Sequence, residues 1–170
     1  MVILRATQKV LRLLPTATDL PVHSSSALGD WYVNRIVIDR RPLLLLVSAN
    51  SLLSILSAAR DVATLPERLP WLVATRLKRL GIPAAWIEAE RAAMEPIVVA
   101  RTNSRSVLGT MRNFAIDISW VLPASGWDDA FLPLVEARLE DTPCHVAKRD
   151  SDVVWPSQRT RELLKAAHGS

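Results

Sequence analysis

The sequence predicts an α+β domain in which a small mixed β-sheet of about four strands is covered by helices. The first observation is the length, because 170 residues fit one compact domain. The second is the composition: 49% of the residues are hydrophobic and 22% are charged, which is too apolar for a disordered chain. The third is the order of the patterns, since short apolar stretches typical of strands alternate with longer stretches of helical periodicity.

The first half of the chain predicts a strand, a short helix, a loop and a hairpin. Residues 2–5 are apolar, and Thr7 is placed to cap a helix that ends before Pro15. Residues 15–28 lack periodicity and predict a loop. Residues 31–48 alternate and then become wholly apolar, which predicts a β-hairpin with a buried second strand.

The second half predicts several helices and one further strand. Thr64 and Glu67 have the spacing of a capping box, which opens a helix that Gly81 ends. A helix over 84–95, a strand over 97–100 and a long helix opened by Asn103 and Ser104 follow. Residues 128–140 are helical in character, and residues 157–168 form a short basic helix or a frayed tail. We expect residues 1–122 to form the core and residues 123–170 a C-terminal helical extension packed on the same domain.

One segment requires a comparison with membrane helices, because residues 42–59 contain no charge and reach the lower length limit for spanning a bilayer. Serines and Asn50 interrupt this segment. Residues 43–47 are wholly apolar, whereas polar and apolar residues are mixed after Val47. It therefore predicts a buried strand followed by a helix. Charged residues also interrupt the N-terminal stretch, so we expect no signal peptide and a cytoplasmic protein without membrane association.

Several segments resemble a bacterial family of domains of unknown function. They are Val2–Lys9, the Leu-Gly-Asp-Trp-Tyr-x-Asn motif at 28–34, and the Thr-Asn-x-Arg-Ser-Val-Leu-Gly motif at 102–109. The resemblance extends from residue 1 to about residue 122 and implies no known activity. The family tends to have Asn-Asp-Phe after the second motif, whereas this chain has Arg112-Asn113-Phe114.

The candidate site lies where the strand over 97–101 runs directly into a helix start. Backbone N–H groups, hydroxyls and a guanidinium at that point could hold a phosphate or carboxylate; the alternative is an ordinary N-cap with a solvated arginine. Residues from the other two matching segments are expected to converge there, although the 28–32 motif is more typical of a turn packed by aromatic side chains. The predicted ligand-binding residues are Arg5, Thr7, Asp30, Tyr32, Asn34, Asn103, Ser104, Arg105 and Ser106.

Three functions remain open. The first is a binding or regulatory module for a small anionic ligand. The second is an enzyme acting on a phosphate- or carboxylate-bearing substrate, with Arg105 stabilising charge and Asp30 as acid or base. The third is a nucleic-acid or protein partner in a mobile-element or toxin–antitoxin type operon, which would use its basic helices. Two groups of exposed side chains are predicted on these helices. The first is Arg68, Thr75, Arg76 and Arg79, and the second is Arg159, Arg161 and Lys165.

The sequence gives little support for a disulfide, a zinc site or a nucleophilic catalytic site. The chain has a single cysteine, Cys144, and three histidines, which exclude an internal disulfide and a His/Cys zinc cluster. Cys144 precedes His145, but adjacent side chains rarely point to the same place, so a catalytic pair is disfavoured. Without a Gly-rich phosphate loop, a G-x-S-x-G motif or an H-E-x-x-H motif, the sequence predicts no cofactor and no metal.

Overall fold

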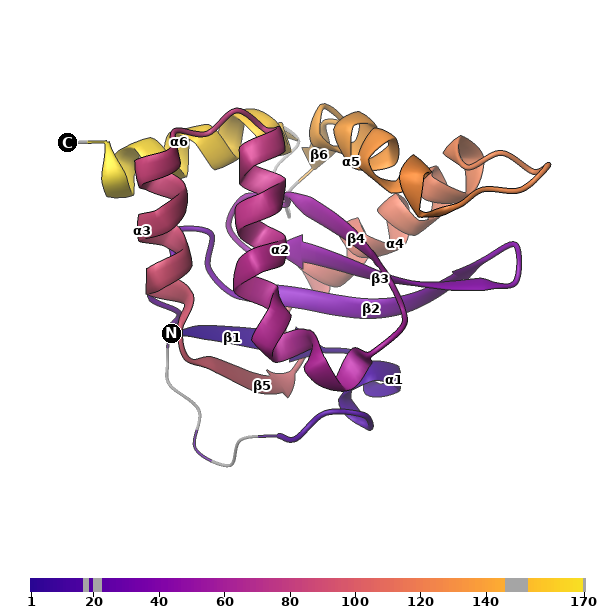
Figure 1. The fold of residues 1–170 in the computed structure, drawn as a ribbon, viewed down its shortest axis with the longest axis horizontal. Coiled ribbons are helices and arrows are strands. Elements are labelled where there is room, and N and C mark those ends of the chain that lie inside the picture. The colour runs from indigo at the N-terminus through magenta and orange to yellow at the C-terminus, as the bar shows by residue number, and fades with distance from the viewer. Residues whose placement is uncertain (17–18, 20–22, 146–152, 170) are drawn as a thin grey trace.

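The computed structural model describes residues 1–16, 19, 23–145 and 153–169, and it places a β-sheet between two layers of helices (Figure 1). In chain order the elements are β1 (Val2–Ala6), α1 (Gln8–Leu11), β2 (Trp31–Ile38), β3 (Arg41–Ser48), β4 (Ser54–Ala58), η1 (Val62–Thr64), α2 (Leu65–Arg79), α3 (Ala84–Met94), β5 (Ile97–Arg101), α4 (Arg105–Val121), η2 (Asp129–Phe131), α5 (Leu132–Glu140), β6 (Cys144–His145), β7 (Val153–Val154) and α6 (Pro156–His168).

The main sheet is mixed and has the strand order β4-β3-β2-β1-β5. β1 runs parallel to both β2 and β5, whereas β2, β3 and β4 form an antiparallel meander. β6 and β7 pair separately as a two-stranded ribbon. The predicted α+β class with a mixed sheet is confirmed, and the hairpin over 31–48 is present as β2 and β3.

The sheet has one strand more than expected because the segment after Asn50 is not a helix. Residues 54–58 form β4, whose side chains alternate between the two faces of the sheet: Ile55 packs in the core on one face and Leu56 in the core on the other. A strand covered on both faces is apolar on both sides, so its hydrophobic pattern cannot be told from that of a buried helix.

Two hydrophobic cores lie on opposite faces of the sheet. α2, α3 and α6 cover the first face with side chains such as Leu69, Met94 and Leu164. α4 and α5 cover the second face, where Phe114 and Val135 are fully buried. Figure 1 shows α2 and α3 in front of the sheet and α4 behind it. In the part of the chain described here, no helix is long and apolar enough to cross a membrane.

α2 begins at the predicted residue but without the predicted capping box. The Thr64 side chain makes no cap hydrogen bond; its Oγ1 donates instead to the carbonyl oxygen of Asp61 at 2.9 Å. Asp61 has a left-handed backbone, with φ of 57°, and the tight 3₁₀ turn that follows draws the hydroxyl backwards. Pro66 in the first turn lacks an N–H group, which lessens the need for a cap.

The C-terminal segment is a packed helix rather than a frayed tail. Thr160 and Leu164 of α6 are completely buried. At its end, His168 Nε2 lies 3.1 Å from Glu90 Oε2. Glu90 is itself buried on α3 and accepts hydrogen bonds from the backbone N–H groups of Ala27 and Leu28. α6 is thereby joined to α3 and to the loop before β2.

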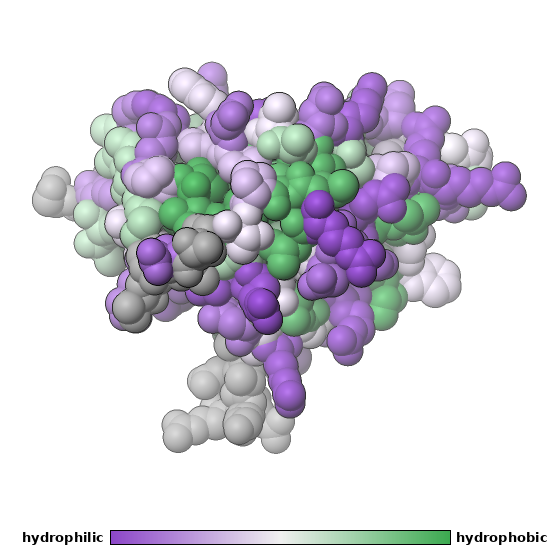
Figure 2. All heavy atoms as spheres, turned by 90° about the horizontal axis from the view of Figure 1, so that it is seen from below, coloured by the Kyte–Doolittle hydropathy of each residue, from purple (hydrophilic) through white to green (hydrophobic). Residues whose placement is uncertain are grey.

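The β5 edge of the sheet is apolar. Among the described strands, β5 pairs with β1 alone, and its Ile97 and Val98 are half-buried. Figure 2, which views the molecule from below, where β5 lies, shows apolar side chains gathered at the centre between hydrophilic ones. The polar residues predicted for the site lie instead near the carboxyl ends of β1 and β5 and around the start of β2.

Candidate functional site

The register of the parallel strands places the first predicted residues side by side. Arg5 of β1 is opposite Tyr32 of β2, and paired residues on adjacent strands point to the same face of a sheet. That face is the one covered by α4, because Tyr32 belongs to the same core cluster as Phe114. Two residues 27 positions apart therefore meet beneath the start of α4.

Arg5 and Asp30 form a partly buried ion pair. Arg5 Nε donates to Asp30 Oδ2 at 2.7 Å, and Arg5 Nη1 donates to the carbonyl oxygen of Arg101 at 3.2 Å. The other carboxylate oxygen, Asp30 Oδ1, accepts a hydrogen bond from Ser24 Oγ at 2.5 Å. Since both oxygens of Asp30 are engaged, this geometry does not favour Asp30 as a catalytic acid or base.

Four further predicted residues also bond within the protein, in two pairs. Tyr32 Oη donates to Asn103 Oδ1 at 2.5 Å, and burial raises the pKa of Tyr32 above its usual value, while the positive charge of Arg5 acts in the opposite direction. Thr7 Oγ1 donates to Asn34 Oδ1 at 2.7 Å instead of capping α1. These contacts fix the ends of the strands but engage the groups that could bind a ligand.

Ser104 is the N-cap of α4, as the ordinary interpretation of the motif predicts. Its Oγ accepts a hydrogen bond from the backbone N–H of Val107 at 3.3 Å. With the Tyr32–Asn103 hydrogen bond just before it, this cap sets where the helix starts and in which direction it runs. Seven of the nine predicted residues therefore make hydrogen bonds within the protein: Arg5, Thr7, Asp30, Tyr32, Asn34, Asn103 and Ser104.

Arg105 and Ser106 are placed differently, because they face an open pocket of about 520 Å³ on the outer side of α4. We refer to it as the α4 pocket. It is lined by Arg105, Ser106, Gly109, Thr110, Arg112, Asn113 and His145.

The α4 pocket is electropositive. Two guanidinium groups and one imidazole line it, and the described residues contribute no carboxylate to its lining. Among the described residues, no carboxylate comes within 4.0 Å of the Arg105 or Arg112 side chain either. Such a pocket can accept an oxyanion, because a guanidinium group can donate two parallel hydrogen bonds to two oxygens of a phosphate or carboxylate.

Gly109 is unexplained by the packing of the protein. It lies inside α4, where glycine costs up to about 1 kcal/mol relative to alanine. Within the part of the chain that the structure describes, a Cβ built at this position meets no atom within 4 Å, so no described neighbour requires its absence. Gly109 instead lines the α4 pocket, and the missing side chain leaves space there.

The α4 pocket continues along the helix. A second pocket, of about 220 Å³, shares Thr110, Asn113 and His145 with it and is also lined by Asp117 and Cys144. Burial, together with the nearby Asp117 charge, raises the pKa of Cys144 to about 11. The thiol is therefore protonated near neutral pH. Cys144 is also buried while His145 is exposed, which disfavours a catalytic pair.

Five residues that line the α4 pocket were not predicted from the sequence as ligand contacts: Gly109, Thr110, Arg112, Asn113 and His145. Gly109 and Arg112 follow Arg105 at the i+4 and i+7 positions of one helix face, a spacing that was available from the sequence. Asn113 lies beside them. His145 could not be placed from the sequence, because it reaches the pocket from β6, 40 residues beyond Arg105.

The basic surface predicted on α2 is wrong in its placement of Arg76. Arg76 was expected on the exposed face of α2, but its side chain is only 2% exposed. It pairs with Glu140 at 2.7 Å and lies 3.8 Å from Glu136, and Arg79 also pairs with Glu136. These ion pairs join α2 to α5 and remove Arg76 from the exposed basic group that the sequence predicted on α2.

Comparison with known proteins identifies the family to which this chain is similar. The family model DUF6933, described as a domain of unknown function, matches residues 3–159. The matched range includes both motifs noted in the sequence and all residues of the α4 pocket. No curated protein and no solved structure matches the chain.

Proposed function

The chain belongs to the DUF6933 family, and on the geometry of the α4 pocket we propose that it is a cytoplasmic binding module for a phosphate- or carboxylate-bearing ligand. The supporting observation is that two arginines and a histidine line an open pocket to which the described residues add no carboxylate. An intracellular location is in keeping with the free cysteine at position 144.

The roles of the side chains follow from their positions on α4. Arg105 and Arg112 are two helical turns apart on one face, about 10 Å along the axis, so they can bind separate oxyanion groups of one ligand. Ser106 and Asn113 add a hydroxyl and an amide beside the guanidiniums. The positive end of the helix dipole contributes at the Arg105 end.

The hydrogen-bonded network beneath the helix start has a supporting role. Arg5, Tyr32 and Asn103 do not face the α4 pocket, but they fix the position from which α4 begins. A fixed helix start holds Arg105 and Ser106 in place before a ligand arrives, and preorganisation of this kind lowers the entropic cost of binding.

Isothermal titration calorimetry with pyrophosphate and citrate tests the proposal. We expect both anions to bind the native protein, with affinity that falls as salt is added. Arg112→Ala should weaken binding about 10- to 100-fold, the range for loss of a hydrogen bond to a charged group. Lys78→Ala removes an exposed cation from α2, on the other face of the sheet, and should leave affinity unchanged. Equal affinity of native protein and Arg112→Ala would show that the α4 pocket is not the site.

A further inference from the structure

A groove extends the α4 pocket along the length of α4, on one face of the helix. The α4 pocket shares Thr110 and Asn113 with the second pocket. The second pocket shares Asp117 and Thr142 with a third, of about 310 Å³. We refer to the three together as the α4 groove. Its other wall is formed by α5, β6 and the connection between them, through Arg138, Leu139, Thr142, Pro143, Cys144 and His145.

The α4 groove is long compared with a small anion. It begins at Arg105 and reaches Trp120, which at 1.5 Å per residue is about 22 Å along the helix. A single phosphate or carboxylate compound occupies only one end of such a length. The groove therefore fits an extended, polymeric ligand.

The charges of the groove favour a polyanion. Arg105 and Arg112 lie at one end and Arg138 at the other, with His145 between them. Asp117 is the sole carboxylate that the described residues bring into its lining. Arginines spaced along a groove match the repeated phosphates of a nucleic-acid backbone.

An exposed aromatic side chain stands at the far end. Trp120 is 84% exposed, more than the other large hydrophobic residues found on the described surface. Leaving an indole in water has no benefit for the fold, whereas its flat face can stack with any nucleobase. Ile116, one turn earlier on α4, is also exposed and widens the apolar area next to Trp120.

We propose that the α4 groove binds single-stranded nucleic acid, with backbone phosphates on Arg105, Arg112 and Arg138 and a base stacked on Trp120. This inference rests on the proposed function, because the α4 pocket supplies the first phosphate contacts. Gly109, in the floor of the pocket, lets the strand approach the helix backbone closely. A span of about 22 Å corresponds to a short run of nucleotides, on the order of four, at the lower end of the site sizes known for single-strand binding proteins.

Fluorescence anisotropy with labelled uridine and deoxythymidine oligonucleotides of one, two, four and eight residues tests the inference. Affinity should rise steeply with length up to about four nucleotides and then level off. For the octamers, the plot of log affinity against log salt should have a slope of about −2, as expected for three neutralised phosphates. Preference between the two series identifies RNA or DNA as the ligand, and either preference supports the proposal.

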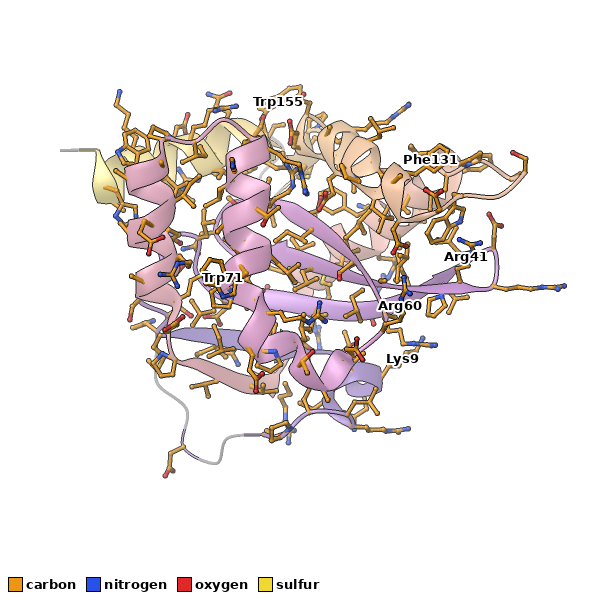
Figure 3. The ribbon with its side chains drawn as sticks, viewed as in Figure 1. Lys9, Arg41, Arg60, Trp71, Phe131 and Trp155 are labelled. Atoms are coloured by element: carbon orange, nitrogen blue, oxygen red, sulfur yellow. The ribbon has the colours of Figure 1, made fainter. Side chains whose placement is uncertain are left out.

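Two tryptophan variants locate the stacking position. Trp120→Ala should weaken octamer binding about 5- to 100-fold, the range for loss of one stacked base. Trp71→Ala is the matched control: Trp71 is 62% exposed on α2, on the front side of the molecule in Figure 3, whereas α4 lies behind the sheet. It should bind the octamer like the native protein.

The outcomes separate the two proposals. If pyrophosphate binds but octamers bind no tighter than mononucleotides, the inference is wrong and the proposed function stands. If neither pyrophosphate nor any oligonucleotide binds, both are wrong. Tighter binding of octaglutamate than of the octanucleotides would overturn the inference in favour of an acidic protein partner. Equal affinity for a duplex of the same sequence would overturn the single-strand assignment.

Discussion

Tyr32 donates a hydrogen bond from Oη to Asn103 Oδ1 over 2.5 Å, which joins the second strand of the sheet to the residue just before the N-cap of α4. Tyr32 is fixed in the sheet by pairing with Arg5 on one side and Val47 on the other. The start of α4 is therefore defined by the centre of the sheet and not by its own loop alone. Any ligand held on α4 is placed relative to the sheet through this contact.

Removal of the Tyr32 hydroxyl tests that relationship. We expect Tyr32→Phe to lower the free energy of unfolding by about 1 kcal/mol, the usual net value of one hydrogen bond. For a chain of this size, that corresponds to a fall in Tm of about 2–4 °C. Urea denaturation at neutral pH measures the change. An unchanged midpoint would show that the contact contributes nothing to stability.

The pH dependence of the same residue gives a second prediction. Burial raises the pKa of Tyr32 above the ordinary value of 10.0. Above pH 10 the unfolded chain therefore loses the phenol proton before the folded protein does, so stability falls as pH rises through this window. Tyr32 is the single tyrosine of the chain, and its near-ultraviolet tyrosinate absorbance should titrate at higher pH in the folded protein than in urea. Coincident titrations would contradict the burial effect.

The buried ion pairs between α2 and α5 predict unequal effects of two neighbouring arginines. Arg76→Ala leaves the buried Glu136 without its most enclosed partner and should cost about 3–5 kcal/mol. Arg79→Ala removes a partner that is 40% exposed, so water can replace it and the loss should be smaller. Urea denaturation of both variants decides between them, and equal losses would contradict this assignment.

The dependence of the free energy of unfolding on pH should also change in Arg76→Ala. Burial raises the pKa of Glu136, while Leu56 N–H, Arg76 and Arg79 oppose that rise. When a carboxyl group has a higher pKa in the folded protein than in the unfolded chain, the free energy of unfolding falls as the pH rises above the ordinary pKa of 4.5. Without Arg76 that raised pKa moves further up, so Arg76→Ala should lose less stability at pH 4.5 than at pH 7. A loss independent of pH would argue against a buried carboxylate.

Cys144 is expected to be unreactive. Because burial raises its pKa to about 11, only about one thiol in a thousand is ionised at pH 8. Iodoacetamide should therefore modify the native protein at least about 100-fold more slowly than the urea-unfolded chain. Since the chain has one cysteine, intact mass follows the reaction directly. Similar rates in the two states would mean that the thiol is open and ionised.

Most of the elements were predictable from the sequence because their signals are local. The hairpin over 31–48, the cap at Ser104 and the helix end at Gly81 each depend on a few adjacent residues. β4 was mistaken for a helix because a strand that is buried on both faces loses its alternation. The Thr64 capping box failed because the turn before it redirects the hydroxyl.

The candidate site was predictable only in part, because it depends on tertiary placement. The sequence indicated the segment 102–106, yet it could not show that Arg5 and Asp30 bond to each other and leave Arg105 to face the pocket. Arg76 was misplaced for the same reason, since its partner Glu140 is 64 residues away. His145 joined the pocket through β6, whose position depends on the packing of α5.

The central claim is that α4 presents a ligand pocket, and Gly109→Ala tests it most directly. As a helix-interior substitution with open space around the new methyl group, it should raise the free energy of unfolding by about 0.5–1 kcal/mol. The same methyl group should lower affinity for pyrophosphate at least tenfold. Ser119→Ala, exposed on the same helix and outside the groove, should leave affinity unchanged. A stabilised Gly109→Ala protein with weakened binding is the predicted result, and a stabilised protein with native affinity would contradict the claim.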